Sequence, residues 1–519
     1  MDILSPADDR RERLIRLLLF AILVVGTALR VVHFGSRLFH VDEALFASYG
    51  LLIASGKDLL LQTEPVDKPP LFFYVLGLCF RLFGRAETVA ALPSLAASVA
   101  GIYLVYRFCR DHFGPAEGLV AAALLAASPF DVSYSYTAFI DPTMVGCVLL
   151  ALLLAGRGHF LAAGVCAGLL PALKAQGILF WPVLALAGVL FLARSRARPS
   201  GRLLAVLLAL VGTALPLLAL AQWSAARPQQ PPFLDLATAH NPLVPALAAT
   251  YTARLAEWWQ SSLQFFTASA PLNVLLLAGL PLLLLWDLGV LLRGGHDRLA
   301  AAADWGLAAF GLLFVGWHVY YQLPAWDRYM VGLGPFALIL LARILTLPWH
   351  ALTSLAPRPA GAPATAYTLA GALVLGLGLL LTQPVQAGLQ SAYSLGWSGS
   401  GGPTTYQGLP AVIGYLKAYA PPGAKIYDYK SLSWHYKYYL FDQPLQIVWF
   451  DDTYIGSFQQ NVAADRGRDN KFLVLPAWED DATVRRQLEG DAVLLTPLYR
   501  TYRDDGTISF TIYKVEARG

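Results

Sequence analysis

The chain has 519 residues, of which 56% are hydrophobic and only 14% are charged, and its mean hydropathy is +0.53. Because roughly a quarter of the residues in a soluble domain are charged, this composition excludes an ordinary soluble protein and indicates a polytopic membrane protein. The net charge of +4 is small and the basic residues are scattered among short loops, which excludes a nucleic-acid-binding surface. We therefore interpret lysine and arginine as markers of membrane topology.

The N-terminal segment, residues 1–16, carries four arginines ahead of an apolar run that is too long for a cleaved signal peptide. We expect a cytoplasmic N-terminus and an uncleaved first helix. The four cysteines lie in apolar segments without CxxC spacing, so the sequence predicts neither a disulfide framework nor a zinc knuckle.

Eleven apolar segments are candidates for crossing a bilayer core about 30 Å thick, which takes roughly 20 residues as a helix. They are Leu14–Phe34, Val89–Phe108, Ala116–Phe139, Thr143–Ala155, Phe160–Leu173, Ile178–Ala193, Leu203–Trp223, Leu272–Leu292, Trp305–Tyr321, Tyr329–Leu347 and Tyr367–Thr382. If they alternate from a cytoplasmic start, the arginine-rich loops face the cytoplasm, as the positive-inside rule expects. A further apolar run, Pro70–Gly84, is ambiguous. If it crossed the membrane fully, every later arginine-rich loop would lie on the outer side, against the positive-inside rule. We expect it to be a half-inserted or interfacial helix on the outer side.

The C-terminal part of the chain is less apolar and predicts a separate domain. Residues 383–407 include a glycine- and serine-rich stretch typical of a flexible linker. After it, strands are expected at Ala424–Tyr429, Leu445–Phe450, Phe472–Pro476, Ala492–Leu495 and Ile508–Val515, and helices at Pro410–Tyr419 and Ala482–Glu489. The sequence thus predicts a mainly α membrane bundle over residues 1–382, with outer loops at 35–87 and 224–270, and an extracytoplasmic α/β domain over 408–519.

Two adjacent carboxylates, Asp42 and Glu43, follow the first apolar run. They begin a stretch, Ala44–Ala54, that we expect to form an amphipathic helix along the outer membrane surface. One interpretation is structural, with Asp42 capping this helix and Glu43 complementing its dipole. The functional interpretation rests on position, because carboxylates at the mouth of a membrane-embedded bundle are costly unless they are used.

Four other charged residues are expected on the same outer side. Lys68 stands before two prolines that hold it at headgroup depth, where it either binds a lipid phosphate or simply extends to the interface. Asp141 precedes a proline at a helix start, where capping alone would explain it. Lys174 lies between two short apolar segments, and Arg328 precedes a late one. Each of these two cations is either a further phosphate ligand or a simple loop cation.

Several kinds of site are disfavoured. No GxGxxG, Walker A, HExxH or GxSxG motif stands in the structural context that it requires, which argues against a soluble nucleotide-sugar or ATP enzyme. The outer loop 224–270 contains only Asp235 and Glu257 as acids, so a divalent metal is unsupported. The sequence therefore predicts a metal-free site without a cofactor. For His240 and His318 we expect structural roles.

The order and spacing of these motifs resemble those of the GT-C glycosyltransferases, in particular the branch that holds the protein O-mannosyltransferases and the lipid A aminoarabinose transferases. The resemblance covers roughly the first 350 residues. It rests on Asp42-Glu43, Lys68-Pro69-Pro70, Asp141-Pro142, Lys174–Gly177 and Arg328-Tyr329. The loop Lys174–Gly177 departs from the Lys-Gly-Pro that family members often carry.

The resemblance implies transfer of a sugar from a polyprenyl-phosphate carrier to a protein, lipid or glycan acceptor, on the outer face of the plasma membrane and with inversion at the anomeric carbon. Asp42 would then be the general base. Glu43 and Asp141 would position the acceptor or the sugar, and Lys68, with Lys174 or Arg328, would stabilise the leaving phosphate. Two alternatives are a transporter or flippase of lipid-linked sugars and a non-catalytic assembly subunit.

Overall fold

The computed structural model describes residues 6–35, 38–195, 198–240, 242–293, 297–321, 323, 327–355, 376–389, 405–465 and 470–518. The chain divides into two compact units. The first unit comprises Met1–Phe34, Asp58–Val75 and Thr88–Tyr393, and the second comprises Gly35–Lys57, Leu76–Glu87 and Ser394–Gly519. Two segments of the expected loop 35–87 are thus grouped with the C-terminal residues.

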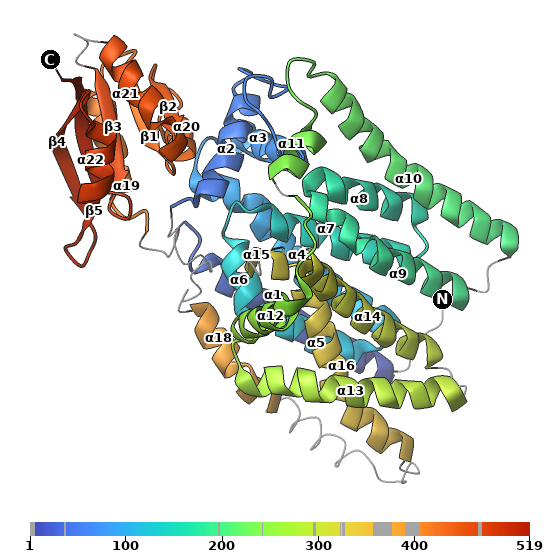
Figure 1. The fold of residues 1–519 in the computed structure, drawn as a ribbon. Coiled ribbons are helices and arrows are strands. Elements are labelled where there is room, and N and C mark those ends of the chain that lie inside the picture. The colour runs from blue at the N-terminus through green and yellow to red at the C-terminus, as the bar shows by residue number, and fades with distance from the viewer. Residues whose placement is uncertain are drawn as a thin grey trace. The chain divides into compact units, whose positions relative to one another are not determined.

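The first unit is helical (Figure 1). Its helices are α1 (Pro6–Val31), α4 (Glu87–His112), α5 (Pro115–Ala127), α6 (Pro129–Ser135), α7 (Ile140–Ala155), α8 (Phe160–Leu173), η1 (Ala175–Phe180), α9 (Trp181–Arg194), α10 (Pro199–Ala225), α11 (Phe233–His240), η2 (Ala248–Thr250), α12 (Tyr251–Phe265), α13 (Ala270–Arg293), α14 (Arg298–Tyr320), α15 (Asp327–Met330), α16 (Gly334–Leu355) and α18 (Thr382–Leu389). Helix α3 (Leu71–Phe83) begins in the first unit and ends in the second.

Within the described ranges, six helices are long and apolar enough to cross a membrane, and the bent pair α5–α6 makes a seventh. The chain is therefore a multi-pass membrane protein. Helices α7 and α8 have only 16 and 14 residues, so the expected eleven crossings stay a prediction. Helix α3 has 13 residues, too few to cross alone, and its half-inserted or interfacial position stays a prediction. The expected crossing Tyr367–Thr382 lies largely outside the described residues.

One expected crossing, Ala116–Phe139, is wrong as a single helix. The chain bends by 58° between α5 and α6, at Ser128-Pro129. Proline has no backbone N–H and its ring collides with the preceding turn, so a helix that reaches it ends and a new one begins with proline at its first position. Hydropathy does not reveal this break because both helices are apolar.

A buried arginine satisfies the carbonyl groups at the bend. Arg30 of α1 is fully buried and donates to the carbonyl oxygens of Leu125 at 3.1 Å and Ala126 at 3.0 Å. The same guanidinium donates to Ser98 Oγ at 2.6 Å and forms an ion pair with Asp131 of α6. Since the last carbonyls of a helix have no partner within it, Arg30 replaces the hydrogen bonds lost at the break.

We expect Arg30→Met to destabilise the folded protein by about 3–5 kcal/mol, because it leaves the mostly buried Asp131 carboxylate without its cation and two carbonyls without their donor. Thermal unfolding of the detergent-purified protein measures this as a lower midpoint. Arg16→Met, on the exposed side of α1, is the control and leaves the midpoint unchanged. Equal midpoints for Arg30→Met and wild type would contradict the assigned role.

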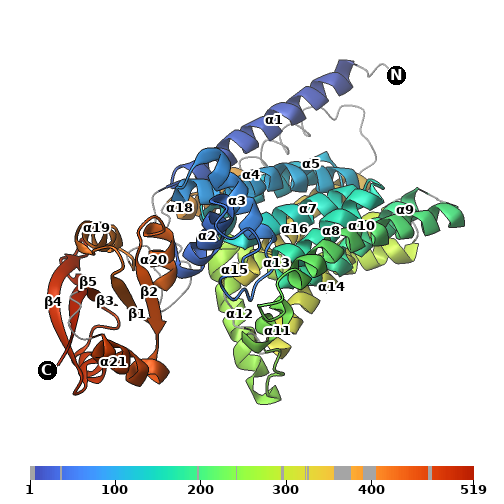
Figure 2. The same ribbon diagram turned by 90° about the horizontal axis from the view of Figure 1, so that it is seen from above.

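Helices α8 and α10 lie side by side in Figures 1 and 2 and approach closely through glycine. A methyl group on Gly164 would collide with the carbonyl oxygen of Ala209, and one on Gly212 with that of Leu161. Small residues that let backbones approach are typical of helix pairs in membranes. This packing fixes α8, the helix that ends before Lys174.

The second unit contains α2 (Val41–Ala54), the end of α3 and a five-stranded sheet flanked by helices. The sheet has the order β2-β1-β3-β5-β4, with β1 parallel to β2 and β3, and β5 antiparallel to β3 and β4. Its elements are α19 (Leu409–Tyr419), β1 (Lys425–Tyr429), α20 (Ser433–Tyr439), β2 (Gln446–Phe450), η3 (Asp452–Tyr454), α21 (Ile455–Ala464), β3 (Lys471–Pro476), α22 (Ala482–Glu489), β4 (Val493–Tyr502) and β5 (Ile508–Ala517). The five strands and two helices predicted here are confirmed, but β4 is longer than predicted, and α20 and α21 were missed.

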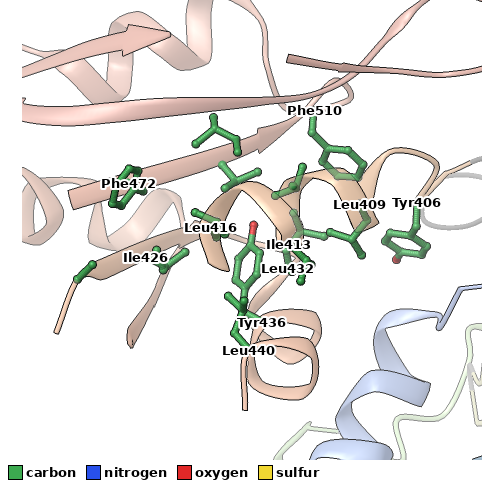
Figure 3. Packing of buried hydrophobic residues seen from close by; sticks show 14 residues of the cluster. Tyr406, Leu409, Ile413, Leu416, Ile426, Leu432, Tyr436, Leu440, Phe472 and Phe510 are labelled. Carbon is green, nitrogen blue, oxygen red and sulfur yellow. The ribbon is translucent and has the colours of Figure 1, made fainter. Parts of the chain in front are cut away.

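Side chains alternate between the two faces of this sheet, as the period of a strand requires. On one face, Ile426, Phe472 and Phe510 pack against α19 and α20 (Figure 3). On the other, Tyr427 and other strand residues pack against α21 and α22. Figure 2 shows the sheet with α19 and α20 on one side and α21 on the other. The domain therefore has two hydrophobic cores of its own.

A buried carboxyl group, Asp428, links the sheet to α20. It lies at the end of β1 and accepts hydrogen bonds from the backbone N–H groups of Leu432 at 2.9 Å and Ser433 at 2.7 Å. Burial raises the pKa of Asp428 to about 7, although these hydrogen bonds oppose the rise. The folded state therefore binds a proton that the unfolded chain, with an ordinary pKa of 3.8, releases at lower pH.

Because the folded-state pKa is above the unfolded one, we expect Asp428 to reduce the stability as pH rises from about 4 to about 7, by up to about 1.4 kcal/mol per pH unit. Asp428→Asn should remove this slope while keeping an acceptor oxygen for α20. The measurement is the thermal midpoint of the full chain at pH 5 and pH 8, and the wild type should lose more between the two than the variant. Parallel losses would contradict the raised pKa.

Candidate active site

An ion pair between two short helices forms the centre of the candidate site in the first unit. Asp141 is the second residue of α7 and is 3% exposed, and Lys174 is the residue that ends α8. Lys174 Nζ lies 2.6 Å from Asp141 Oδ1. The structural interpretation of Asp141 as a helix cap is wrong, because Phe139 is the N-cap of α7. The carboxylate instead pairs with the lysine 33 residues further along.

Aromatic rings surround these charges. Lys174 Nζ lies 4.6 Å from the centre of the Tyr329 ring, and the guanidinium carbon of Arg328 lies 5.7 Å from the same ring. Arg328 is also 5.8 Å from the ring of Phe139. Aromatic faces attract cations at such distances, so the tyrosine holds both cations near one carboxylate. The structure thus brings Asp141, Lys174 and Arg328 together.

The loop after Lys174 is held by hydrogen bonds that the sequence did not reveal. The Gln176 side-chain nitrogen lies 2.6 Å from Nε2 of His318, whose Nδ1 lies 2.8 Å from the Phe314 carbonyl oxygen. A histidine that donates from Nδ1 to this carbonyl accepts at Nε2 from the Gln176 amide. Arg254 of α12 donates to the His318 carbonyl at 3.0 Å. His318 therefore orients the loop, in agreement with the structural role expected for it.

Lys68 belongs to a different group of charges. Its Nζ lies 3.1 Å from both carboxylate oxygens of Asp67, and Asp67 Oδ2 lies 3.1 Å from Nδ1 of His240. Burial opposes the ionisation of Asp67, but the Lys68 charge and the His240 hydrogen bond outweigh it and lower the pKa of Asp67. The Lys68 side chain is about one-third exposed, so it is accessible to an anion.

The loop that carries Lys68 is fixed by Arg227, which sequence reasoning missed. Arg227 is 2% exposed and donates to the carbonyl oxygen of Leu61 at 3.0 Å. Its guanidinium carbon lies 4.4 Å from the ring centre of Trp223 at the end of α10. On the loop itself, Asp58 accepts from the backbone N–H of Thr63 at 2.7 Å. A lone arginine in the long segment 224–270 gives no sequence signal for such a role.

The acidic pair lies in the second unit, at the start of α2. The helix begins at Val41 and its N-cap is His40, so the interpretation of Asp42 as the cap is wrong. Glu43 Oε2 accepts from the His40 backbone N–H at 2.7 Å, and His40 Nδ1 accepts from the Asp42 N–H at 3.2 Å, forming a capping box. Glu43 is therefore part of the helix start, and a role in acceptor positioning stays a prediction.

Asp42 and Glu43 differ in how far their side chains are exposed to solvent. Glu43 is 1% exposed, whereas the Asp42 side chain is 21% exposed. Asp42 is therefore the member of the pair that solvent and a substrate can reach. Helix α2 itself is buried on all sides, from Ala44 to Leu51, and is not the amphipathic surface helix expected from the sequence.

A metal centre was not expected. In the part of the chain that the structure describes, no three His, Cys, Asp or Glu side chains are grouped so as to hold a metal ion. The metal-free site stays a prediction.

Comparison with solved structures identifies the architecture. The structure is similar to ArnT from Cupriavidus metallidurans bound to undecaprenyl phosphate, with a TM-score of 0.61 and 17% identity over 95% of this chain and 97% of ArnT. The chain has the GT-C fold. The GT-C fold is also found in the archaeal oligosaccharyltransferase AglB from Archaeoglobus fulgidus, which matches with a TM-score of 0.55 and 14% identity over 96% of this chain and 74% of AglB.

Sequence comparison covers a smaller part of the chain. Residues 67–218 match the family described as dolichyl-phosphate-mannose-protein mannosyltransferase, a range that includes Lys68, Asp141 and Lys174. YycA of Bacillus subtilis (strain 168), named as a mannosyltransferase, is 32% identical over 85 residues, which are 16% of this chain and 12% of that protein. The predicted resemblance to GT-C glycosyltransferases is thus confirmed, through the fold along nearly the whole chain and through sequence over part of it.

Proposed function

We propose that the chain transfers a sugar from a polyprenyl-phosphate-linked donor to an acceptor on the outer face of the membrane, with inversion at the anomeric carbon. The observation that carries the proposal is the group of Asp141, Lys174, Arg328 and Tyr329, in which two cations lie within 6 Å of one ring. Lysine and arginine are the usual ligands of phosphate groups. The undecaprenyl phosphate in ArnT supports a lipid phosphate as the ligand.

In the proposed reaction, the acceptor hydroxyl attacks the anomeric carbon while the bond from that carbon to the phosphate oxygen breaks. The electron pair leaves with the polyprenyl phosphate, whose negative charge increases. Lys174, Arg328 and Lys68 stabilise that charge, and one preorganised group of this kind is worth about 10²–10³ in kcat. Asp42 takes the acceptor proton, which contributes about 10²–10⁴. Asp141 orients Lys174 and contacts the sugar.

The exposure of Asp42 and the burial of Glu43 support Asp42 as the base, because a base must reach the hydroxyl within about 3 Å. Asp42 lies beyond the first membrane helix, where a soluble nucleotide-sugar donor is not supplied. A donor activated in the membrane meets that requirement. We further propose a plasma-membrane location with a cytoplasmic N-terminus and an extracytoplasmic C-terminal domain.

The test is transfer of radiolabelled sugar by the purified full chain from polyprenyl-phosphate donors, each carrying one of several hexoses or pentoses, into membrane acceptors. Transfer from one donor, with the opposite anomeric configuration in the product, is the expected result and identifies the sugar. If every donor binds but none loses its sugar, the transferase proposal is contradicted. Movement of the intact donor between the leaflets of a vesicle would then favour a flippase.

A further inference from the structure

The C-terminal domain contacts the acidic segment of the second unit through one short helix. Helix α20 packs against α2, and Tyr49 of α2 lies 5.3 Å from the Trp434 ring. The Phe39 ring meets the Tyr438 ring edge-on at 4.9 Å between centres. Ser48 donates to the Trp434 carbonyl oxygen at 3.2 Å. These contacts join residues nearly 400 positions apart.

The end of α3 is joined to the same region. Arg85 and Asp442 form an ion pair at 2.6 Å, and Tyr439 of α20 donates to Glu87. The Lys57 ammonium lies 4.1 Å from the ring centre of Phe441. Helices α2 and α3 are themselves in close contact, because a methyl group on Gly50 would lie 2.8 Å from Leu76 Cβ. The segment around Asp42 is therefore packed on the domain from two sides.

One hydrogen bond reaches the chain just before the acidic pair. His435 is fully buried, and its Nε2 lies 3.0 Å from the carbonyl oxygen of Phe39, next to the N-cap His40. A carbonyl only accepts, so Nε2 is the protonated nitrogen. Burial lowers the pKa of His435 to about 4, so the ring is neutral at physiological pH and keeps this tautomer.

His435 makes this bond from an apolar environment. It lies between Tyr406, 4.6 Å away between ring centres, and Tyr439, and among the described residues its Nδ1 has no hydrogen-bond partner. Burying a polar ring is costly unless it makes a hydrogen bond. The bond to Phe39 is the one polar contact that compensates for that cost among the residues described here.

Helix α20 is in turn held rigidly by its own domain. The Asp428 carboxyl group accepts from the first backbone N–H groups of the helix, and Leu432, Tyr436 and Leu440 insert into the core between sheet and α19 (Figure 3). An unbroken series of contacts thus runs from strand β1 through α20 to Phe39, His40 and Asp42.

We propose that the C-terminal domain positions Asp42, with His435 as the positioning residue that fixes the chain at Phe39. The inference rests on the proposed function, because Asp42 is the general base of the proposed reaction. A base displaced by about 1 Å loses about 10²-fold in rate. In this proposal the domain acts in catalysis through the chain segment that carries Asp42.

The test compares His435→Leu with His435→Gln, whose amide nitrogen replaces Nε2 as a donor. In the full chain, His435→Leu should speed amide hydrogen exchange of residues 39–46 about tenfold and lower kcat about 10- to 100-fold. The KM for the donor should stay within about twofold, because the phosphate ligands are elsewhere in the chain. His435→Gln should restore both quantities to within about threefold of wild type.

Val462→Ala is the matched control, since Val462 is fully buried on the opposite face of the sheet. It should lower the thermal midpoint without changing kcat or exchange at residues 39–46.

Unchanged exchange in His435→Leu, or an equal kcat loss in Val462→Ala, would overturn the positioning role. If wild type transfers no sugar but exchange responds as expected, the proposed function fails and the positioning stands. If Asp42→Asn abolishes transfer while His435→Leu changes neither quantity, only the positioning fails.

Discussion

Replacing Asp42 by Asn is expected to lower kcat for sugar transfer by about 10²–10⁴-fold, with the donor KM within about twofold of wild type. The physical reason is that an amide cannot take the proton of the acceptor hydroxyl. The fold should tolerate the change, since Asp42 contributes its backbone N–H to the capping box, donating to His40 Nδ1, and Asn keeps that N–H. Initial rates with purified protein, together with the thermal midpoint, provide the measurement.

Asp235→Asn is the matched control for this variant. Asp235 is an exposed acid on α11, and its loss should leave kcat unchanged. A variant Asp42→Asn that keeps more than half of the wild-type rate would show that another group takes the proton. A lower midpoint for Asp42→Asn would instead assign the carboxylate to the helix start.

Removing the Lys174 charge has the second large expected effect. Lys174→Met should lower kcat by about 10²–10³-fold, because one cation no longer faces the leaving phosphate. Asp141→Asn should cost less, about tenfold, because the lysine keeps its charge but loses the carboxylate 2.6 Å away that orients it. The double variant should be no slower than Lys174→Met, since Asp141 acts largely through the lysine. A double-mutant cycle of kcat measures this coupling.

The control for Lys174→Met breaks a different ion pair, whose N–O distance is close to that of Lys174 and Asp141. Arg157 and Asp111 lie 2.7 Å apart, and Arg157→Met should change kcat by less than about twofold. If the effects of Lys174→Met and Asp141→Asn multiply in the double variant, the two residues act independently. A loss confined to KM would mean that Lys174 binds the donor equally in the ground and transition states.

The elements that depend on local pattern were predicted well. Strands β1, β2 and β3 begin one residue from their predicted starts and end where expected, because short apolar runs between turn residues mark strands. The predicted strand Ala492–Leu495 ended too early, because Pro497 interrupts the apolar run, and a proline inside a run argues against a continuous strand. The short helix α20 was missed because its seven residues, rich in aromatics, carry no helical period.

Sequence reasoning named three residues that the structure groups together, but it did not predict which of them pair, and their roles stay a prediction. Asp141, Lys174 and Arg328 were each named from motif order, yet no local signal says that Asp141 pairs with Lys174 rather than capping its helix. The same limit applies to Asp42. A capping box that uses histidine as its N-cap is outside the usual Ser, Thr, Asp or Asn preference. Pairings across the chain depend on tertiary packing, which one sequence does not encode in its local pattern.

The contact between Phe39 and His435 also has a consequence for biosynthesis. The two residues are 396 positions apart, so at 5–20 residues per second a ribosome adds the histidine about 20 to 80 s after the phenylalanine. During that interval the membrane helices can already be inserted, while the acidic segment has no domain to dock on. A nascent or truncated chain that ends before residue 435 would therefore reside in the bilayer without the hydrogen bond that fixes this segment. The synthesis of residues 409–518 would then determine when the protein first becomes competent.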